Sequence, residues 1–225
     1  MKKLIFSALC ALVIVSLAGC RRDYKTSMRY NNQPTNFYNW SWTSQTAPWG
    51  VCDANGNEII PRVYKKPVKF RGDYFLADSV NKQILFSLEG KRLLEAEKVD
   101  RTDLRWFLVC TDKGKQKVFD LRTNTAIGNY EQVKVFACAG QVFFLIAEKE
   151  KKGIADIKGN YLLEPQYGNF IFAVDKLKDK PVGFIIAQNE NTYEKYSLDG
   201  KSLGTLTEKQ VLKEKTKKGR EIKEL

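Results

Sequence analysis

The sequence predicts an all-β fold made of about five antiparallel repeats of roughly 35 residues each. Short turn motifs recur at nearly constant spacing, and short apolar segments rich in β-branched and aromatic residues flank each of them. No segment between residues 38 and 206 has a sustained helical period. These observations favour strands throughout the central part of the chain, which is long enough to bury a sizeable core.

The turns define the repeats. They begin at Asp53, Ser87, Asp120, Asp156 and Ser197, and these first residues lie 34, 33, 36 and 41 positions apart. Four of the turns end in glycine, which adopts the positive φ that a tight hairpin needs. The opening Asp or Ser can accept a hydrogen bond from a backbone N–H two residues further on. A regular series of such hairpins predicts a β-repeat protein.

Each repeat contains the same order of segments. An apolar segment precedes the turn by about ten to fifteen residues, a second segment leads into the turn, and a third leaves it; in the fourth repeat these are FFLIAE, IADI and YLLE. Pro61 and Pro165 are predicted to end the third strand of their repeats, because proline cannot donate to the ladder. A connector with further β-branched residues follows, and in a ring it would add a fourth strand to the next repeat.

A three-stranded unit of this size cannot bury both of its faces alone, so neighbouring units must stack. Five units predict a β-propeller-like ring, and the alternative is an open β-solenoid. In a ring, residues 205–212 would pair with the first strand of the first unit, residues 38–43, and remove its exposed edge. The repeat domain is predicted to cover residues 38–212, between a polar tether at residues 20–37 and a basic C-terminal tail at residues 213–225 that is expected to lie in solvent.

Two repeats share a more specific pattern. The first contains Trp49-Gly50, Asp53, Gly56, Ile59-Ile60-Pro61 and Tyr64, and the fourth contains Lys152-Gly153, Asp156, Gly159, Pro165 and Tyr167. This pattern resembles the WG-repeat (KWG-repeat) family, which is common among exported bacterial proteins. The resemblance spans about residues 38–212 but is specific in these two repeats only. It implies an interaction scaffold and supplies no catalytic motif.

The first 19 residues have the anatomy of a secretory signal peptide. Two lysines precede an apolar run at residues 4–18, which is shorter than the ~20 residues that a membrane-spanning helix needs. The run ends in Leu-Ala-Gly-Cys at residues 17–20, which resembles the bacterial lipobox. The resemblance implies cleavage before Cys20, a diacylglycerol on its thiol, and anchoring in the envelope of a Gram-negative-type bacterium, with the outer membrane as the expected site. The alternative is an ordinary secretory signal in which Cys20 is incidental.

The composition limits the possible functions. The chain has no histidine, which excludes Ser-His-Asp and Cys-His catalysis, and no zinc site is expected. Its formal charge of +12 is expected to serve solubility and attraction to acidic lipids or glycans, because an exported chain rarely meets nucleic acid. Cys52, Cys110 and Cys138 lie in apolar runs and are expected to be buried thiols, the alternative being one disulfide and one free cysteine.

Aromatic residues gather just ahead of the first turn. Tyr38, Trp40 and Trp42 alternate along the chain, so they are expected to share one face of a strand, and Trp49 follows closely. These rings either form a surface for a sugar or peptide or pack the core of the first repeat. The turn at Asp53 lacks the ligands of an EF-hand calcium loop and is predicted to be a hairpin.

The sequence therefore predicts a non-catalytic, membrane-anchored β-repeat lipoprotein that uses no cofactor and no metal. It is expected to act as a scaffold that binds an unidentified protein or glycan in the bacterial cell envelope. The alternative is an envelope hydrolase on a β-propeller scaffold, which would need two or three carboxylates in one pocket.

Overall fold

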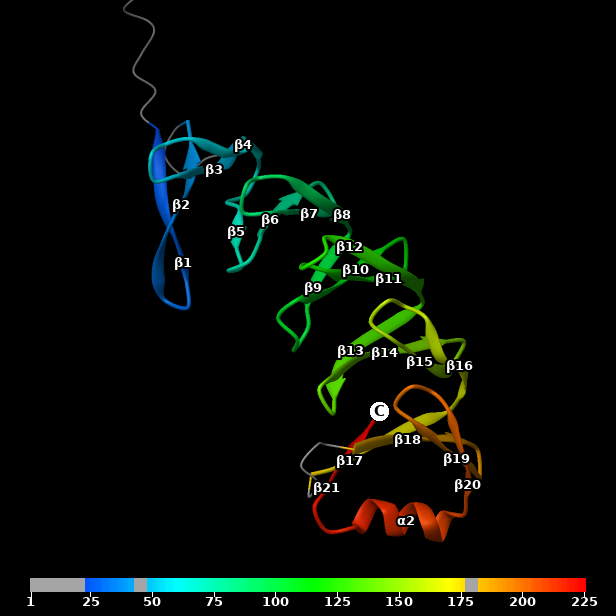
Figure 1. The fold of residues 1–225 in the computed structure, drawn as a ribbon. Helices are drawn as coiled ribbons and strands as arrows, with labels where there is room; N and C mark the ends of the chain where they lie inside the picture. Colours follow the sequence, from blue (N-terminus) through cyan, green and yellow to red (C-terminus); the bar gives the residue numbers. More distant parts are fainter. Residues whose placement is uncertain (1–22, 43–47, 177–181) are drawn as a thin grey trace, which may run out of the picture. The chain divides into compact units, whose positions relative to one another are not determined.

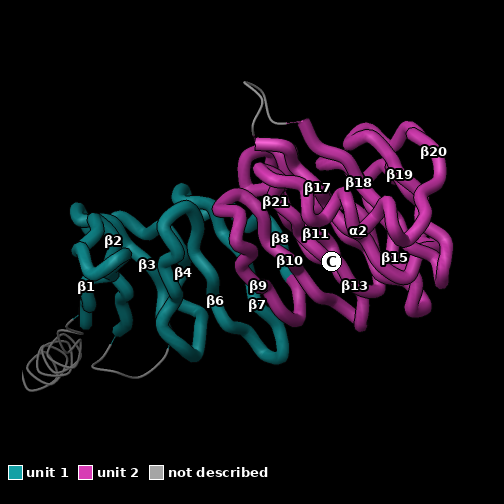
Figure 2. The backbone as a smooth tube through the Cα atoms, turned by 90° about the horizontal axis from the view of Figure 1, so that it is seen from below, with its two compact units in different colours: residues 1–95 teal, residues 96–225 magenta. Residues whose placement is uncertain are grey.

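The computed structural model describes residues 23–42, 48–176 and 182–225, and most of them lie in antiparallel β-strands (Figure 1). This confirms the predicted all-β class. The chain divides into two compact units, residues 1–95 and 96–225, with the boundary at the end of the second sheet (Figure 2). The described part contains one α-helix, which is too short and too polar to cross a membrane. The predicted signal peptide and Cys20 lie outside the described residues.

The described residues form twenty-one strands in five sheets. The first sheet contains β1 (Tyr24–Tyr30), β2 (Gln33–Ser41), β3 (Trp49–Asp53) and β4 (Glu58–Tyr64); the second contains β5 (Lys69–Phe70), β6 (Phe75–Ser79), β7 (Lys82–Phe86) and β8 (Arg92–Ala96). The third contains β9 (Lys98–Arg101), β10 (Phe107–Asp112), β11 (Lys115–Asp120) and β12 (Thr125–Tyr130); the fourth contains β13 (Gln132–Cys138), β14 (Gln141–Glu148), β15 (Lys151–Ala155) and β16 (Tyr161–Tyr167). The fifth contains β17 (Asn169–Asp175), β18 (Val182–Asn189), β19 (Thr192–Ser197), β20 (Ser202–Leu206) and β21 (Arg220–Glu224). The connectors β5, β9, β13 and β17 each supply a fourth strand to the next sheet, as predicted.

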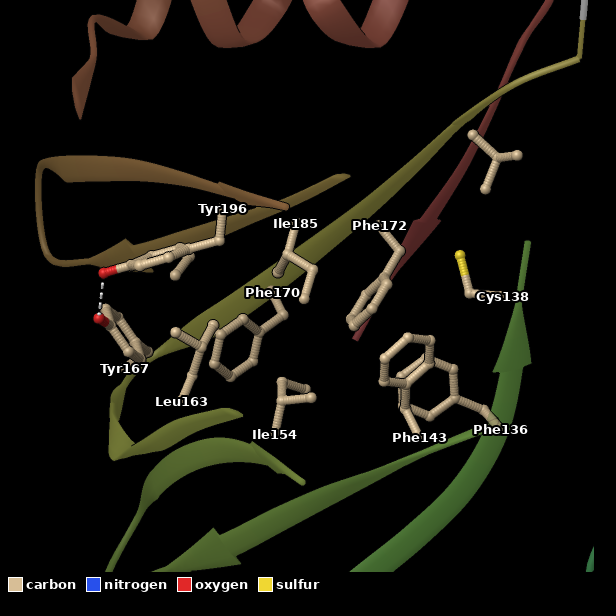
Figure 3. Packing of buried hydrophobic residues seen from close by; sticks show 12 residues of the cluster. Phe136, Cys138, Phe143, Ile154, Leu163, Tyr167, Phe170, Phe172, Ile185 and Tyr196 are labelled. Atoms are coloured by element: carbon tan, nitrogen blue, oxygen red, sulfur yellow. Dashed lines mark hydrogen bonds between the residues drawn. The ribbon is translucent and has the colours of Figure 1, made fainter. Parts of the chain in front are cut away.

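Hydrophobic cores form between consecutive sheets within each unit. In the first unit, the Phe37 ring of the first sheet lies 5.0 Å from the Phe75 ring of the second. In the second unit, the fourth and fifth sheets enclose a cluster in which the rings of Phe136 and Phe172 are 4.9 Å apart (Figure 3). The same cluster contains a hydrogen bond of 2.7 Å between the hydroxyls of Tyr167 and Tyr196. Neighbouring sheets thus bury each other's apolar faces, as the stacking argument predicts.

The turn glycines have two structural roles. Gly56 has a φ of 88° and donates its N–H to the carbonyl of Asp53 at 3.2 Å, which is the predicted hairpin geometry. In later repeats the glycine also touches the last strand of the preceding sheet. A Cβ on Gly90 would lie 1.9 Å from the carbonyl oxygen of Ile59, and a Cβ on Gly200 would lie 2.8 Å from that of Leu162. The turn glycine therefore also lies where two sheets approach each other too closely for a side chain.

The first sheet differs from the prediction at its edge. Residues 24–41 form β1 and β2, so the tether predicted at residues 20–37 is wrong from residue 24 onward. β1 occupies the edge that the ring prediction gave to residues 205–212. Those residues instead end β20 and begin a helix, and among the described strands no ladder joins the first and fifth sheets. The predicted closing pairing is therefore wrong, because the chain just ahead of the repeats supplies the missing strand.

The C-terminal segment is folded onto the fifth sheet and does not form a separate tail, although most of its charged side chains are exposed as expected. Helix α2 (Glu208–Thr216) begins with a capping box of Thr207 and Gln210, and its Val211 is buried against the fifth sheet. β21 then pairs with the edge of β17. Arg220 forms ion pairs with Glu214 and Asp175. The segment therefore completes the fifth sheet and covers part of one of its faces (Figure 1).

The two prolines do not end their strands as predicted. Pro61 lies inside β4 and Pro165 inside β16. Both strands are at the edge of their sheets, and the ladder beside each of them is irregular. In the first sheet, the register shifts between Trp49 and Val51. An edge position and an irregular register are the places where a sheet tolerates proline.

The three cysteines of the repeats are buried and free, as predicted. They lie in three different sheets, on β3, β10 and β13. Burial raises the pKa of Cys110 to about 12 and that of Cys138 to about 11.

We expect the protein to lose stability in alkaline solution because of these thiols. The folded state holds the Cys110 proton up to a pKa of about 12, whereas an exposed thiol loses it near 9.0. Between these values the unfolded chain binds fewer protons, so the free energy of unfolding falls as the pH rises. From about pH 8 to about pH 10.5, this fall should be ~2 kcal/mol smaller in Cys110→Ala than in the wild type. Urea unfolding at both pH values measures the difference, and equal falls would contradict the prediction.

Candidate functional site

The candidate site lies on the face of the first sheet that points away from its core. Phe37 on β2 faces the second sheet, where its ring meets Phe75. Because side chains alternate along a strand, Tyr38 and Trp40 lie on the opposite face. Trp42 follows directly after the end of β2. The structure thus keeps Tyr38, Trp40 and Trp42 near one another at the end of one strand.

The guanidinium group of Arg62 is stacked between two of these rings. Its Cζ lies 3.6 Å from the ring centroid of Trp40 and 3.2 Å from that of Trp42. The Nη1 of Arg62 donates a hydrogen bond of 2.8 Å to Asp23. The Trp40 side chain is almost fully buried, whereas Trp42 is 39% exposed. Sequence reasoning missed Arg62 and Asp23, because no motif shows that Arg62 reaches across the sheet.

Gly50 has no side chain, and this leaves space for the Arg62 side chain to cross the sheet. Gly50 lies opposite Trp40 in the β2–β3 ladder. A Cβ at this position would be 2.9 Å from the Cγ of Arg62 and 2.4 Å from the carbonyl oxygen of Ile60. The glycine of the Trp-Gly pair is therefore required by the close approach of β4 and of the Arg62 side chain.

Trp49 belongs to the core of the first unit. It is 6% exposed, and its ring lies edge-on to Tyr24 at 5.8 Å. Its buried neighbours include Val51 and Tyr64. Trp49 is one of the four predicted partner-binding residues. Its burial agrees with the alternative prediction, in which the aromatic residue packs the core.

The electrostatics of the site favour an acceptor group. Lys25 pairs with Trp40 across the β1–β2 ladder, and its Nζ lies 5.8 Å from the Trp40 ring. Arg62 and Lys25 thus provide two positive charges, and the carboxylates of Asp23 and Asp53 lie in the same neighbourhood around Cys52. Two buried donors, Nε1 of Trp40 and Nε of Arg62, have no hydrogen-bond partner among the described residues. The site therefore combines aromatic surfaces, two cationic side chains and unused N–H groups.

The turn next to this site uses its carboxylate internally. Oδ1 of Asp53 accepts a hydrogen bond from the backbone N–H of Asn57, and Oδ2 accepts one from the Asn57 amide, both at 2.8 Å. These hydrogen bonds lower the pKa of Asp53. Within the described parts of the chain, no group of three or more His, Cys, Asp or Glu side chains is placed to hold a metal ion.

Four of the surface hollows on the described residues lie elsewhere. The one between β13 and β17 has a volume of about 230 Å³, and the one between β4 and β6 has a volume of about 350 Å³. Each of the four is lined by one carboxylate: Glu221, Glu208, Asp78 and Glu214.

No protein-family model matches the sequence, and no curated protein matches it. The resemblance to the WG-repeat family therefore stays a prediction. Among solved structures, a eukaryotic initiation factor is similar, with a TM-score of 0.35 and 13% identity over 72% of this chain and 51% of that one. An S. cerevisiae complex of Dbp5 with Nup159, Gle1, IP6 and ADP has a TM-score of 0.26 and 13% identity over 79% of this chain and 62% of that one. The chain spans about half the length of the initiation factor, and neither likeness is strong enough to support an argument about function.

Proposed function

We propose that the protein is a lipid-anchored, non-catalytic β-repeat scaffold that binds a protein or glycan partner in the bacterial cell envelope. The observation that carries the binding role is the stack of Trp40, Arg62 and Trp42 on the face of the first sheet that points away from its core. Tryptophan and arginine are among the residues enriched at binding hot spots. The anchoring role is supported by the resemblance of residues 17–20 to a lipobox.

Four hollows of the described residues offer no pair of carboxylates for hydrolysis. A glycosidase site uses a pair of carboxyl groups on either side of the scissile bond. Each of the four hollows contains a single carboxylate. We therefore assign the partner surface to the aromatic face of the first sheet.

The anchor is tested by metabolic labelling with radioactive palmitate. Wild-type protein expressed in a bacterial host should incorporate label and sediment with membranes. Cys20→Ala should lose both properties, because it removes the thiol that accepts the diacylglycerol. Equal labelling of the two proteins would refute lipidation at Cys20.

The partner surface is tested by capture from envelope extracts. Trp42→Ala should weaken capture of the principal partner about tenfold or more, since removing a hot-spot ring costs at least ~2 kcal/mol. Because Trp42 is 39% exposed but also stacks on Arg62, the melting temperature of the variant is measured to show that it is folded. Trp106→Ala is the matched control, since Trp106 is equally exposed and lies beside Arg105. Unchanged capture by Trp42→Ala would remove this face as the binding surface.

A further inference from the structure

We propose that the stack of Trp40, Arg62 and Trp42 recognises a carboxylate carried by an acidic sugar, so that the partner is an acidic glycan. This inference rests on the proposed binding role of the same face. It starts from the two donors in the stack that have no acceptor. Nε1 of Trp40 and Nε of Arg62 are both buried without a partner in the described residues. The Trp40 residue is 7% exposed and the Arg62 side chain 9%.

Such donors are rarely left unpaired in folded proteins. More than nine in ten buried polar groups have a hydrogen-bond partner, and an unpaired one is costly. Both donors belong to one cluster, because the Cζ of Arg62 lies 3.6 Å from the Trp40 ring centroid. One acceptor group supplied from outside could therefore satisfy both of them.

The orientation of the guanidinium group favours a carboxylate as that acceptor. Asp23 accepts a hydrogen bond from Nη1 of Arg62. Nε lies on the other edge of the planar guanidinium group. That edge can bind a second carboxylate through two parallel hydrogen bonds. Lys25 adds a second cation, whose Nζ lies 5.8 Å from the Trp40 ring centroid. A charged acceptor is thus favoured over a neutral hydroxyl.

The surroundings of the guanidinium favour a sugar as the carrier. Indole rings lie on both sides of Arg62, and Trp42 is 39% exposed at the mouth of the stack. A pyranose ring is rigid and presents C–H groups that pack on aromatic surfaces. A rigid carrier also loses little conformational freedom on binding, whereas an Asp or Glu side chain must be ordered. A hexuronate unit therefore combines the required charge with a shape suited to the rings.

The experiment titrates the full-length protein with an oligogalacturonate and, separately, with a neutral galactose oligomer of the same length. Binding is followed by NMR through the indole Nε1–H and arginine Nε–H signals. We expect the acidic oligomer, and not the neutral one, to shift the signals of Trp40 and Arg62. Trp40→Phe and Arg62→Lys should each weaken binding about tenfold or more, because each removes one donor to a charged group. Trp40→Phe keeps an aromatic ring and Arg62→Lys keeps the charge, so each variant is expected to fold. Their melting temperatures check this.

Trp106→Phe is the control for a general effect of losing an exposed indole, and it should bind like the wild type. Equal binding of the neutral oligomer, or unchanged binding by both Trp40→Phe and Arg62→Lys, would overturn the proposal. Tighter binding of an acidic peptide than of the oligogalacturonate would overturn the assignment to a glycan. If no oligosaccharide binds but Trp42→Ala still loses its envelope partner, the acidic-glycan inference fails while the proposed binding role stands. If Trp42→Ala retains its partner, the proposed role itself fails.

Discussion

Removal of residues 207–225 is expected to lower the free energy of unfolding of the second unit by at least ~3 kcal/mol. The truncation exposes the edge of β17, which pairs with β21 over five residues. It also uncovers the apolar groups that pack against Val211, and it leaves Asp175 without the ion pair that it makes with Arg220. Urea unfolding followed by far-UV circular dichroism measures the loss. Amide hydrogen exchange should show that the loss of protection is greatest in β17.

Two point variants of α2 serve as controls for the truncation. Val211→Ala should cost ~1–2 kcal/mol, because Val211 is buried. Leu212→Ala, next to it in the sequence, should change stability by less than ~0.5 kcal/mol, because Leu212 is 61% exposed. If the truncated protein unfolded at the same urea concentration as the full chain, the C-terminal segment would have no stabilising role and the prediction would be wrong.

Gly90→Ala is expected to destabilise the first unit by ~3 kcal/mol or more. Two effects add at this position. The backbone has a φ of 81°, which an alanine adopts only at a cost. The new Cβ would also lie 1.9 Å from the carbonyl oxygen of Ile59, so the first and second sheets would have to move apart. Thermal unfolding compared with the wild type measures the combined effect.

Gly56→Ala separates these two effects. Gly56 ends the same kind of turn, with a φ of 88°, but a Cβ there would meet only the flexible Nζ of Lys25, at 3.3 Å. The variant should therefore lose only the ~1–2 kcal/mol that belongs to the backbone conformation. Equal destabilisation by Gly56→Ala and Gly90→Ala would show that the contact between sheets has no part in the effect.

The repeated strands were predictable because their signals are local. Asp156 and Gly159 form a hairpin through hydrogen bonds that span only a few residues, and the same residue types recur in other repeats. The connectors were predictable for a similar reason, since residues 132–138 and 169–175 carry their own β-branched and aromatic residues. Sequence alone thus locates most of the strands and their order.

The parts that depend on distant contacts were not predictable in the same way. Residues 24–30, YKTSMRY, contain one buried side chain, Met28, so they read as a polar tether although the ladder to β2 makes them a strand. Residues 208–225 are so highly charged that their sequence did not indicate a helix. That helix buries a single side chain, Val211. The stack at Arg62 depends on a path that Gly50 leaves open across the sheet, and this path exists only once β3 and β4 have paired.

The origin of the first sheet's edge strand has a consequence for how the protein folds. With β1 in that position, every ladder among the described strands except that between β17 and β21 joins strands that are consecutive in the chain. Contacts at short sequence separation close small loops, and such topologies form quickly. The first sheet contains all of its strands by residue 64, whereas a closing strand at residues 205–212 would have delayed it until nearly the whole chain was available. The sheets can therefore form one after another as the chain arrives from its N-terminus, and the fifth alone has to wait for the last residues.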